Sequence, residues 1–190
     1  MNMISPTEQE RIAVHEAGHV VCSYLLGGTV IRVTLGKVGV EVYAQETENT
    51  CASSHCEFEK PIFSEMKDVE EYRFKLYQFW KNMLCQLYSG YIAEVVVYQE
   101  FPNEGHVGDF QKTEEFIPYY MATLNPEPIQ YSSQQEQAHK NWLLQQTRDL
   151  LNAPKNRYAI LELAQVLLKR KHLEGVEATE IIRAALEPPI

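Results

Sequence analysis

Basic residues are few in this sequence. Only 17 lysines and arginines stand against 26 acidic residues, which gives a formal net charge of −9 at pH 7. A surface this acidic repels phosphate groups, because like charges oppose association. We therefore expect no nucleic-acid partner and no binding to anionic lipid headgroups.

Long apolar runs are missing as well. No uncharged apolar stretch reaches the roughly 18 residues that a transmembrane helix needs, and the N-terminus has no basic segment followed by an apolar core. We therefore expect a cytoplasmic protein that makes no membrane contact. Four cysteines are spread through this chain of ordinary size and no secretory signal accompanies them, so reduced thiols are expected at Cys22, Cys51, Cys56 and Cys85.

The remaining composition is that of a folded protein. With 45% apolar and 23% charged residues, the chain has enough apolar material for one core, and we predict a single domain over 1–190. Capping residues and three- to four-residue apolar spacing predict helices over 5–26, 65–98, a short segment from Asp109, 132–152, 154–171 and 175–186. Prolines 118, 126 and 128 mark a linker, and β-branched residues predict strands over 29–35 and 40–44.

These elements predict a mostly helical α+β fold. A small antiparallel sheet of two or three strands should lie beside the first helix, and the C-terminal helices should form a bundle. We expect a metal-site part over 1–125, with a loop or insertion near 45–64, and a helical part over 126–190. Ser5 is expected to cap the first helix, with Pro6 at its first position.

The first helix carries the motif His15-Glu16-Ala17-Gly18-His19. Histidines four residues apart lie on one helix face, one turn above the other, so both imidazoles can reach one metal ion. Glu16 projects beside them, where its carboxylate can accept a proton from water activated by the metal. This is the arrangement of zincin metallopeptidases. Two polar residues on a solvated helix face are the alternative, but the residues around the motif are apolar.

A catalytic zinc needs a third protein ligand. The metzincin extension of the motif is excluded, because Cys22 and Leu25 stand where that extension has glycine and histidine. Aspartate is rare here, with 3 residues against 23 glutamates, and Asp109 follows a flexible stretch that can carry its carboxylate to the metal. From the residues alone, a simple helix-capping role for Asp109 stays open.

Other segments follow the motif in a characteristic order. Residues 13–19 lead to a strand at 30–35, residues 88–94 read Tyr-Ser-Gly-Tyr-Ile-Ala-Glu, and residues 105–110 read Gly-His-Val-Gly-Asp-Phe. With the C-terminal stretch 150–175, these segments resemble the peptidase domain of the FtsH-type family, the membrane-anchored ATP-dependent zinc metalloproteases. The resemblance implies that Asp109 is the third zinc ligand. Tyr91 and Gly108 depart from it, standing where the family has arginine and asparagine.

The ATPase module of that family has no counterpart in these 190 residues. The pair Gly36-Lys37 is followed by Val38 and lacks the phosphate-loop pattern. We therefore expect a zinc endopeptidase that cleaves peptides or unfolded protein without an ATPase of its own, unless a separate ATPase or adaptor partner delivers substrate. The resemblance leaves a homo-oligomer open, because the family assembles into rings.

The expected roles follow from the motif and the resemblance. His15, His19 and Asp109 bind Zn²⁺, and Glu16 is the general base and then the proton donor to the leaving amine. Glu94 either orients a ligand histidine or replaces Asp109 as the third ligand, and we favour orientation. His106 is a further candidate as a ligand or as a donor to the developing oxyanion. His139 and His172 are expected in helices, without a chemical role.

Two other classes of function stay open. A catalytically weak or inactive relative would act as a binding or regulatory module, and a structural metal protein would close its site with four protein ligands. Retention of His15, Glu16, His19 and Asp109 together argues against the inactive relative. Coordination distinguishes the structural metal protein, since three protein ligands plus water would mean a catalytic site. A zinc site at Cys51, His55 and Cys56 has less support, because no second ligand pair follows at finger-like spacing. A strand edge exposed within 29–44 would let an extended peptide pair with the sheet.

Overall fold

The computed structural model describes residues 6–36, 55–58, 69–102, 107–125 and 130–187. Its elements are α1 (Glu8–Leu25), β1 (Val30–Thr34), β2 (His55–Phe58), α2 (Val69–Tyr98), α3 (Val107–Thr123), α4 (Ser133–Asn152), α5 (Pro154–Arg170), β3 (His172–Glu174) and α6 (Gly175–Leu186). The predicted fold class is confirmed at this level: the protein is mostly helical, with one small antiparallel sheet.

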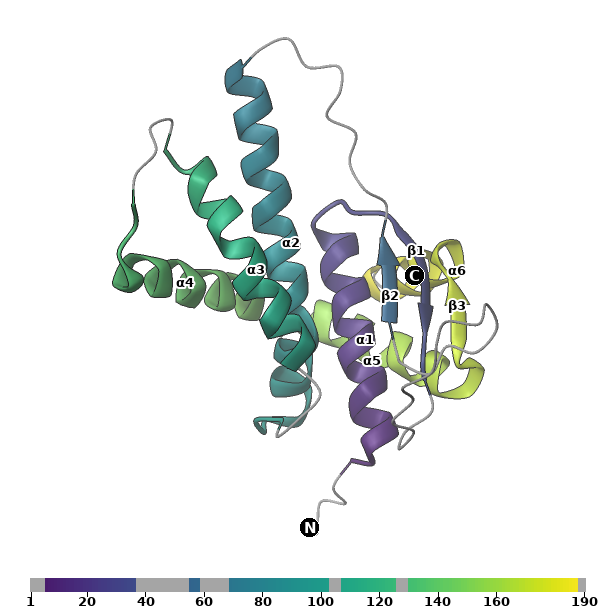
Figure 1. The fold of residues 1–190 in the computed structure, drawn as a ribbon. Helices are drawn as coiled ribbons and strands as arrows, with labels where there is room; N and C mark the ends of the chain where they lie inside the picture. The colour runs from purple at the N-terminus through teal and green to yellow at the C-terminus, as the bar shows by residue number, and fades with distance from the viewer. Residues whose placement is uncertain (1–5, 37–54, 59–68, 103–106, 126–129, 188–190) are drawn as a thin grey trace, which may run out of the picture.

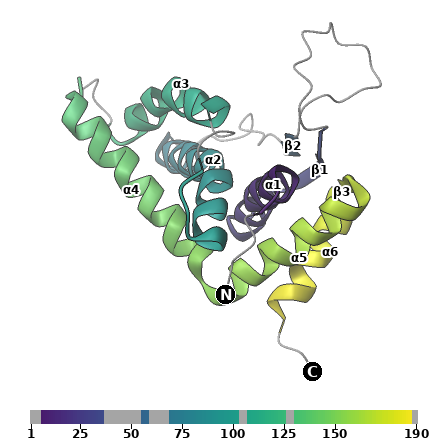
Figure 2. The same ribbon diagram turned by 90° about the horizontal axis from the view of Figure 1, so that it is seen from below.

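Helix α1 lies at the centre of the fold, between α2 on one side and the sheet on the other (Figure 1). Figure 2 shows α4 and α5 as the two arms of a V that holds α2 and α1. Every residue of α1 from Ala13 to Ser23 is buried. A helix buried on all of its faces is a core element, so the alternative of a solvated helix face for the two histidines is wrong.

The N-terminus of α1 is fixed by a capping box rather than by Ser5. Thr7 is the N-cap: its hydroxyl accepts from the Glu10 backbone N–H at 3.2 Å, and the Glu10 carboxylate accepts from the Thr7 N–H at 2.7 Å. The expected cap at Ser5 is therefore wrong. Thr7 and Glu10 have the three-residue spacing that satisfies two otherwise unpaired N–H groups at once.

Helices α1 and α2 approach closely at Gly18. A Cβ atom at this position would collide with the Cβ of Ala93 and with the backbone oxygen of Ser89. Glycine inside the motif therefore lets α2 lie against the helix that carries both histidines.

The sheet has the order β2-β1-β3, and β1 is antiparallel to both neighbours. Two sequence-based expectations are wrong, and a third is not tested. The expected strand over 40–44 lies outside the described residues, whereas β2 falls within the expected loop of 45–64. His172 lies in β3 rather than in a helix. Arg32, Val33 and Thr34 pair with both neighbouring strands, so this part of β1 offers no open edge to a peptide.

The C-terminal region begins its helices where the sequence predicts. Ser132 caps α4, Pro154 opens α5 and Gly175 opens α6. Lys171 turns the chain out of α5 with a left-handed φ of 64°. The linker expected from Pro118 is wrong, since Pro118 lies inside α3. Phe116 and Tyr119, on either side of Pro118, both contact the ring of Trp80 on α2. These contacts oppose the helix break that a proline favours.

Within the described ranges, no helix is both long and apolar enough to cross a membrane.

Candidate metal centre

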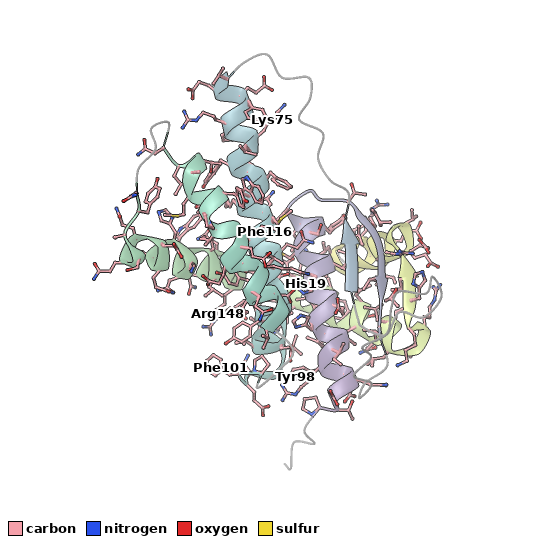
Figure 3. The ribbon with its side chains drawn as sticks, in the orientation of Figure 1. His19, Lys75, Tyr98, Phe101, Phe116 and Arg148 are labelled. Carbon is pink, nitrogen blue, oxygen red and sulfur yellow. The ribbon has the colours of Figure 1, made fainter. Side chains whose placement is uncertain are left out.

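Three side chains from two helices converge on one point. The Nε2 atoms of His15 and His19 lie 3.1 Å apart, and Oδ2 of Asp109 lies 3.0 Å from the first and 3.2 Å from the second. The histidines come from successive turns of α1, and Asp109 comes from the first turn of α3. His19 lies where α1 passes α2 and α3 (Figure 3). Three residues predicted as ligands from separate parts of the sequence are thus adjacent in space.

The hydrogen-bond partners of the two Nδ1 atoms determine which ring nitrogen of each histidine carries a proton. Nδ1 of His15 lies 2.9 Å from Oε1 of Glu94, and Nδ1 of His19 lies 2.7 Å from the backbone oxygen of Gln86. A carboxylate and a carbonyl only accept hydrogen bonds, so each Nδ1 carries the hydrogen. In the neutral imidazoles both Nε2 atoms then present lone pairs to each other and to the Asp109 carboxylate. Such a group requires a cation, either a proton or a metal ion.

The donor set fits a metal ion. Two imidazole nitrogens and one carboxylate oxygen are ligands that zinc accepts, and tetrahedral bonds of about 2.0–2.1 Å separate neighbouring ligand atoms by roughly 3.3 Å. The separations here are 3.0–3.2 Å. The side chains of His15 and His19 are 9% and 10% exposed, and that of Asp109 is 19% exposed. The group can therefore hold a metal ion that stays accessible from the side of Asp109.

The carboxylates dominate the electrostatics of this group. Burial disfavours the charged form of His15, but its hydrogen bonds to Asp109 and Glu94, with the charges of Glu16 and Asp109, outweigh burial and raise its pKa to about 9. Burial also disfavours the charged form of Asp109, but hydrogen bonds from both histidines hold its pKa well below the usual range. Without a metal ion, the site therefore holds a proton at neutral pH.

Metal binding is expected to release that proton. A metal ligand must be deprotonated, so with a His15 pKa of about 9, zinc binding becomes about tenfold tighter per pH unit between pH 7 and 8.5 and levels off above pH 9. Titration calorimetry in buffers of different ionisation enthalpy measures the proton count. Zinc affinity that does not change over this range would contradict the assigned protonation of His15.

Glu94 lies on the far side of the His15 ring from Asp109. It accepts from Nδ1, whereas Asp109 faces Nε2, so Glu94 orients the ring and does not belong to the ligand group. Glu94 is itself held: a guanidinium nitrogen of Arg11 lies 3.9 Å from its other oxygen, and Arg11 also donates to Glu100 at 2.7 Å. A fixed carboxylate that accepts a hydrogen bond from Nδ1 keeps the lone pair of Nε2 directed at the point where a metal ion would bind.

Replacement of Glu94 with alanine is expected to weaken zinc binding by about 10- to 100-fold, because the buried Nδ1–H of His15 loses its acceptor. Glu94→Gln should weaken zinc binding less, since the amide oxygen still accepts a hydrogen bond. Competition titration with a zinc chelator measures both affinities. Equal affinity in wild type and Glu94→Ala would remove the orienting role, and total loss of zinc would make Glu94 a ligand.

Glu16 is buried beside the candidate ligands, with 6% of its surface exposed. It directly follows His15 on α1, and its charge acts on the His15 ring. The motif therefore brings a carboxylate to the group without using it as one of the three converging ligands.

Two small residues of α2 make room for the histidines. A Cβ atom at Gly90 would overlap the imidazole of His15. The hydroxyl of Ser89 donates to the Gln86 oxygen at 2.5 Å and lies 3.3 Å from Nδ1 of His19. Ser89, Gln86 and Arg11 were not among the site residues predicted from the sequence. The adjacent serine and glycine within a long helix were the available signal of a close approach.

The other candidates lie elsewhere. His106 and Cys51 fall outside the described residues, and the side chains of His55 and Cys56 are not described either. His139 lies in α4, with its ring 5.9 Å from that of Tyr120, and His172 bonds Thr34 and Glu174 on the surface. Cys22 is fully buried, as expected for a core residue. No family model and no curated protein matches this sequence.

Proposed function

We propose that this protein is a zinc metallopeptidase that hydrolyses peptide bonds in peptides or unfolded protein. One observation carries the proposal: two histidine lone pairs and the Asp109 carboxylate converge beside a buried glutamate that does not join them. Two histidines and one carboxylate leave a fourth position of zinc for water or substrate, whereas a structural site is closed by four protein ligands.

The roles of the residues follow from their chemistry. Zinc, when bound, acidifies water to a pKa of about 7 and polarises a carbonyl oxygen. Glu16 takes the proton of the attacking water and then gives it to the leaving amine. Glu94 holds His15 in the tautomer that directs Nε2 inward, and the Gln86 carbonyl does the same for His19. The zincin arrangement and the resemblance to FtsH-type peptidases support this division of roles.

The proposed substrates are chains that need no unfolding. These 190 residues contain no phosphate-binding loop. We expect a folded protein to reach the site only with help from an unfolding ATPase or an adaptor.

An assay with an unfolded casein-like substrate tests the proposal. Cleavage is expected with about one equivalent of zinc, should stop after chelation and should return when zinc is added back. A tightly folded protein of similar size should be cut far more slowly, because its peptide bonds are not accessible in extended form. Cleavage that survives chelation, or equal rates on the two substrates, would contradict the proposal. Zinc binding without any cleavage would favour a binding module.

A further inference from the structure

Helix α3 is attached to α2 by a row of aromatic contacts, which we call the aromatic seam. Its ring pairs, with centroids 5.1–5.7 Å apart, are Tyr77–Tyr120, Trp80–Tyr119, Trp80–Phe116, Tyr88–Phe110 and Tyr91–Phe110. The pairs run antiparallel along the two helices, and Phe116 lies where α3 passes α2 (Figure 3). Such ring pairs have directional preferences, so the seam fixes the rotation of α3 as well as its distance from α2.

Asp109 lies at one end of this seam. The next residue, Phe110, has its ring edge-on to two rings of α2, at 5.5 Å from Tyr88 and 5.4 Å from Tyr91. Tyr91 stands at a position where the sequence departs from the FtsH-type motif, and here it supplies one of these two contacts.

The same stretch of α2 serves both sides of the metal centre. The rings of Tyr88 and Tyr91 contact that of Phe110. Ser89, Gly90 and Glu94, from the same stretch, lie against the two histidines. The position of Phe110 on α2 therefore sets where the Asp109 carboxylate lies relative to Nε2 of His15 and His19.

A hydrogen bond within α3 reinforces this end of the seam. The hydroxyl of Thr113 donates to the backbone oxygen of Asp109 at 2.9 Å. Thr113 is buried, with 1% exposure, whereas Val107 at the start of α3 is 58% exposed. Among the described residues of α3, the buried ones that support Asp109 therefore follow it in the chain.

We propose that Phe110 is a positioning residue: its ring, held by Tyr88 and Tyr91, places the Asp109 carboxylate on the metal. The inference rests on the proposed function, since it concerns the third ligand of the same centre. In this proposal Phe110 acts on the metal centre through Asp109.

Phe116 offers a matched control. It is also a half-buried phenylalanine of α3 in the aromatic seam, but it lies more than one helical turn farther from Asp109. Phe110→Ala and Phe116→Ala both remove one ring from the seam. Only the first is expected to displace Asp109.

The test measures zinc affinity by chelator competition for wild type, Phe110→Ala, Phe116→Ala and Phe110→Leu. Phe110→Ala should bind zinc at least about tenfold more weakly, as is typical when the support of a ligand is lost, and its Co²⁺ absorption spectrum should change. Phe116→Ala should stay within about threefold of wild type. Phe110→Leu keeps apolar bulk but loses the two ring contacts, so its zinc affinity should fall between those of Phe110→Ala and wild type. Urea unfolding without metal shows whether the two alanine variants lose similar stability.

Equal zinc affinities of Phe110→Ala and Phe116→Ala at similar stability would overturn the inference and leave the metal centre standing. A wild-type protein without zinc affinity would instead overturn the proposed function, and this inference with it. If Phe110→Ala does not fold, Phe110→Val replaces it, with Phe116→Val as its control. Weaker zinc binding by Phe110→Val alone would then support the inference, and equal zinc affinities of the two variants would overturn it.

Discussion

Glu16→Gln is expected to abolish peptide cleavage while leaving zinc bound. Glutamine has nearly the same shape but cannot take a proton from water, so the loss falls on proton transfer, which contributes about 10²- to 10⁴-fold in rate. Glu16 is buried next to His15 and is not one of the three converging ligands. The measurement is kcat/KM on an unfolded substrate, together with the zinc content of the same preparation.

Glu8→Gln is the matched control for this variant. Glu8 lies in the first turn of the same helix and is exposed, so its substitution removes the same charge without touching the site. It should cleave like wild type. Cleavage by Glu16→Gln within about threefold of wild type would assign the proton transfer to another group, because a lost general base costs far more.

Asp109→Ala and His19→Ala are expected to lose zinc almost completely. Each removes one of the three proposed ligands, so the drop in affinity should exceed the roughly 10- to 100-fold expected for an orienting partner such as Glu94. Zinc at 100 times its Kd is expected to stabilise wild type against unfolding by about 2.7 kcal/mol and so to raise its thermal midpoint. This zinc-dependent rise in the thermal midpoint should vanish in both variants.

Asp149→Ala is the control for the aspartate. Asp149 is an exposed residue of α4 that accepts from Gln145, far along the chain from the metal centre. Its variant should keep wild-type zinc affinity. Zinc binding by Asp109→Ala at wild-type strength would reduce Asp109 to the helix-terminal role that its sequence position alone also allowed.

The histidine pair could be predicted because its geometry is local. A four-residue spacing on a helix fixes the two side chains on one face, whatever the rest of the fold does. Asp109 is a different case, since its approach depends on how α3 packs against α2. The residues alone left a capping role open, and the resemblance to FtsH-type peptidases, not the spacing, favoured a ligand.

The strands were harder to predict because pairing, not propensity, decides them. The segments of β2 and β3 are only 4 and 3 residues long and include charged side chains, so their own sequence gives little β signal. Both become strands because β1 offers them an edge on each side. Likewise, Pro118 predicted a break, but α3 continues through it along the aromatic seam.

X-ray absorption at the zinc edge of the purified protein tests the central claim most directly. The account predicts about one zinc per chain, with only nitrogen and oxygen ligands at about 2.0–2.1 Å, of which two are imidazoles. Absence of zinc after reconstitution would contradict it. So would sulfur ligands at about 2.3 Å, which would place the metal on cysteines rather than on His15, His19 and Asp109.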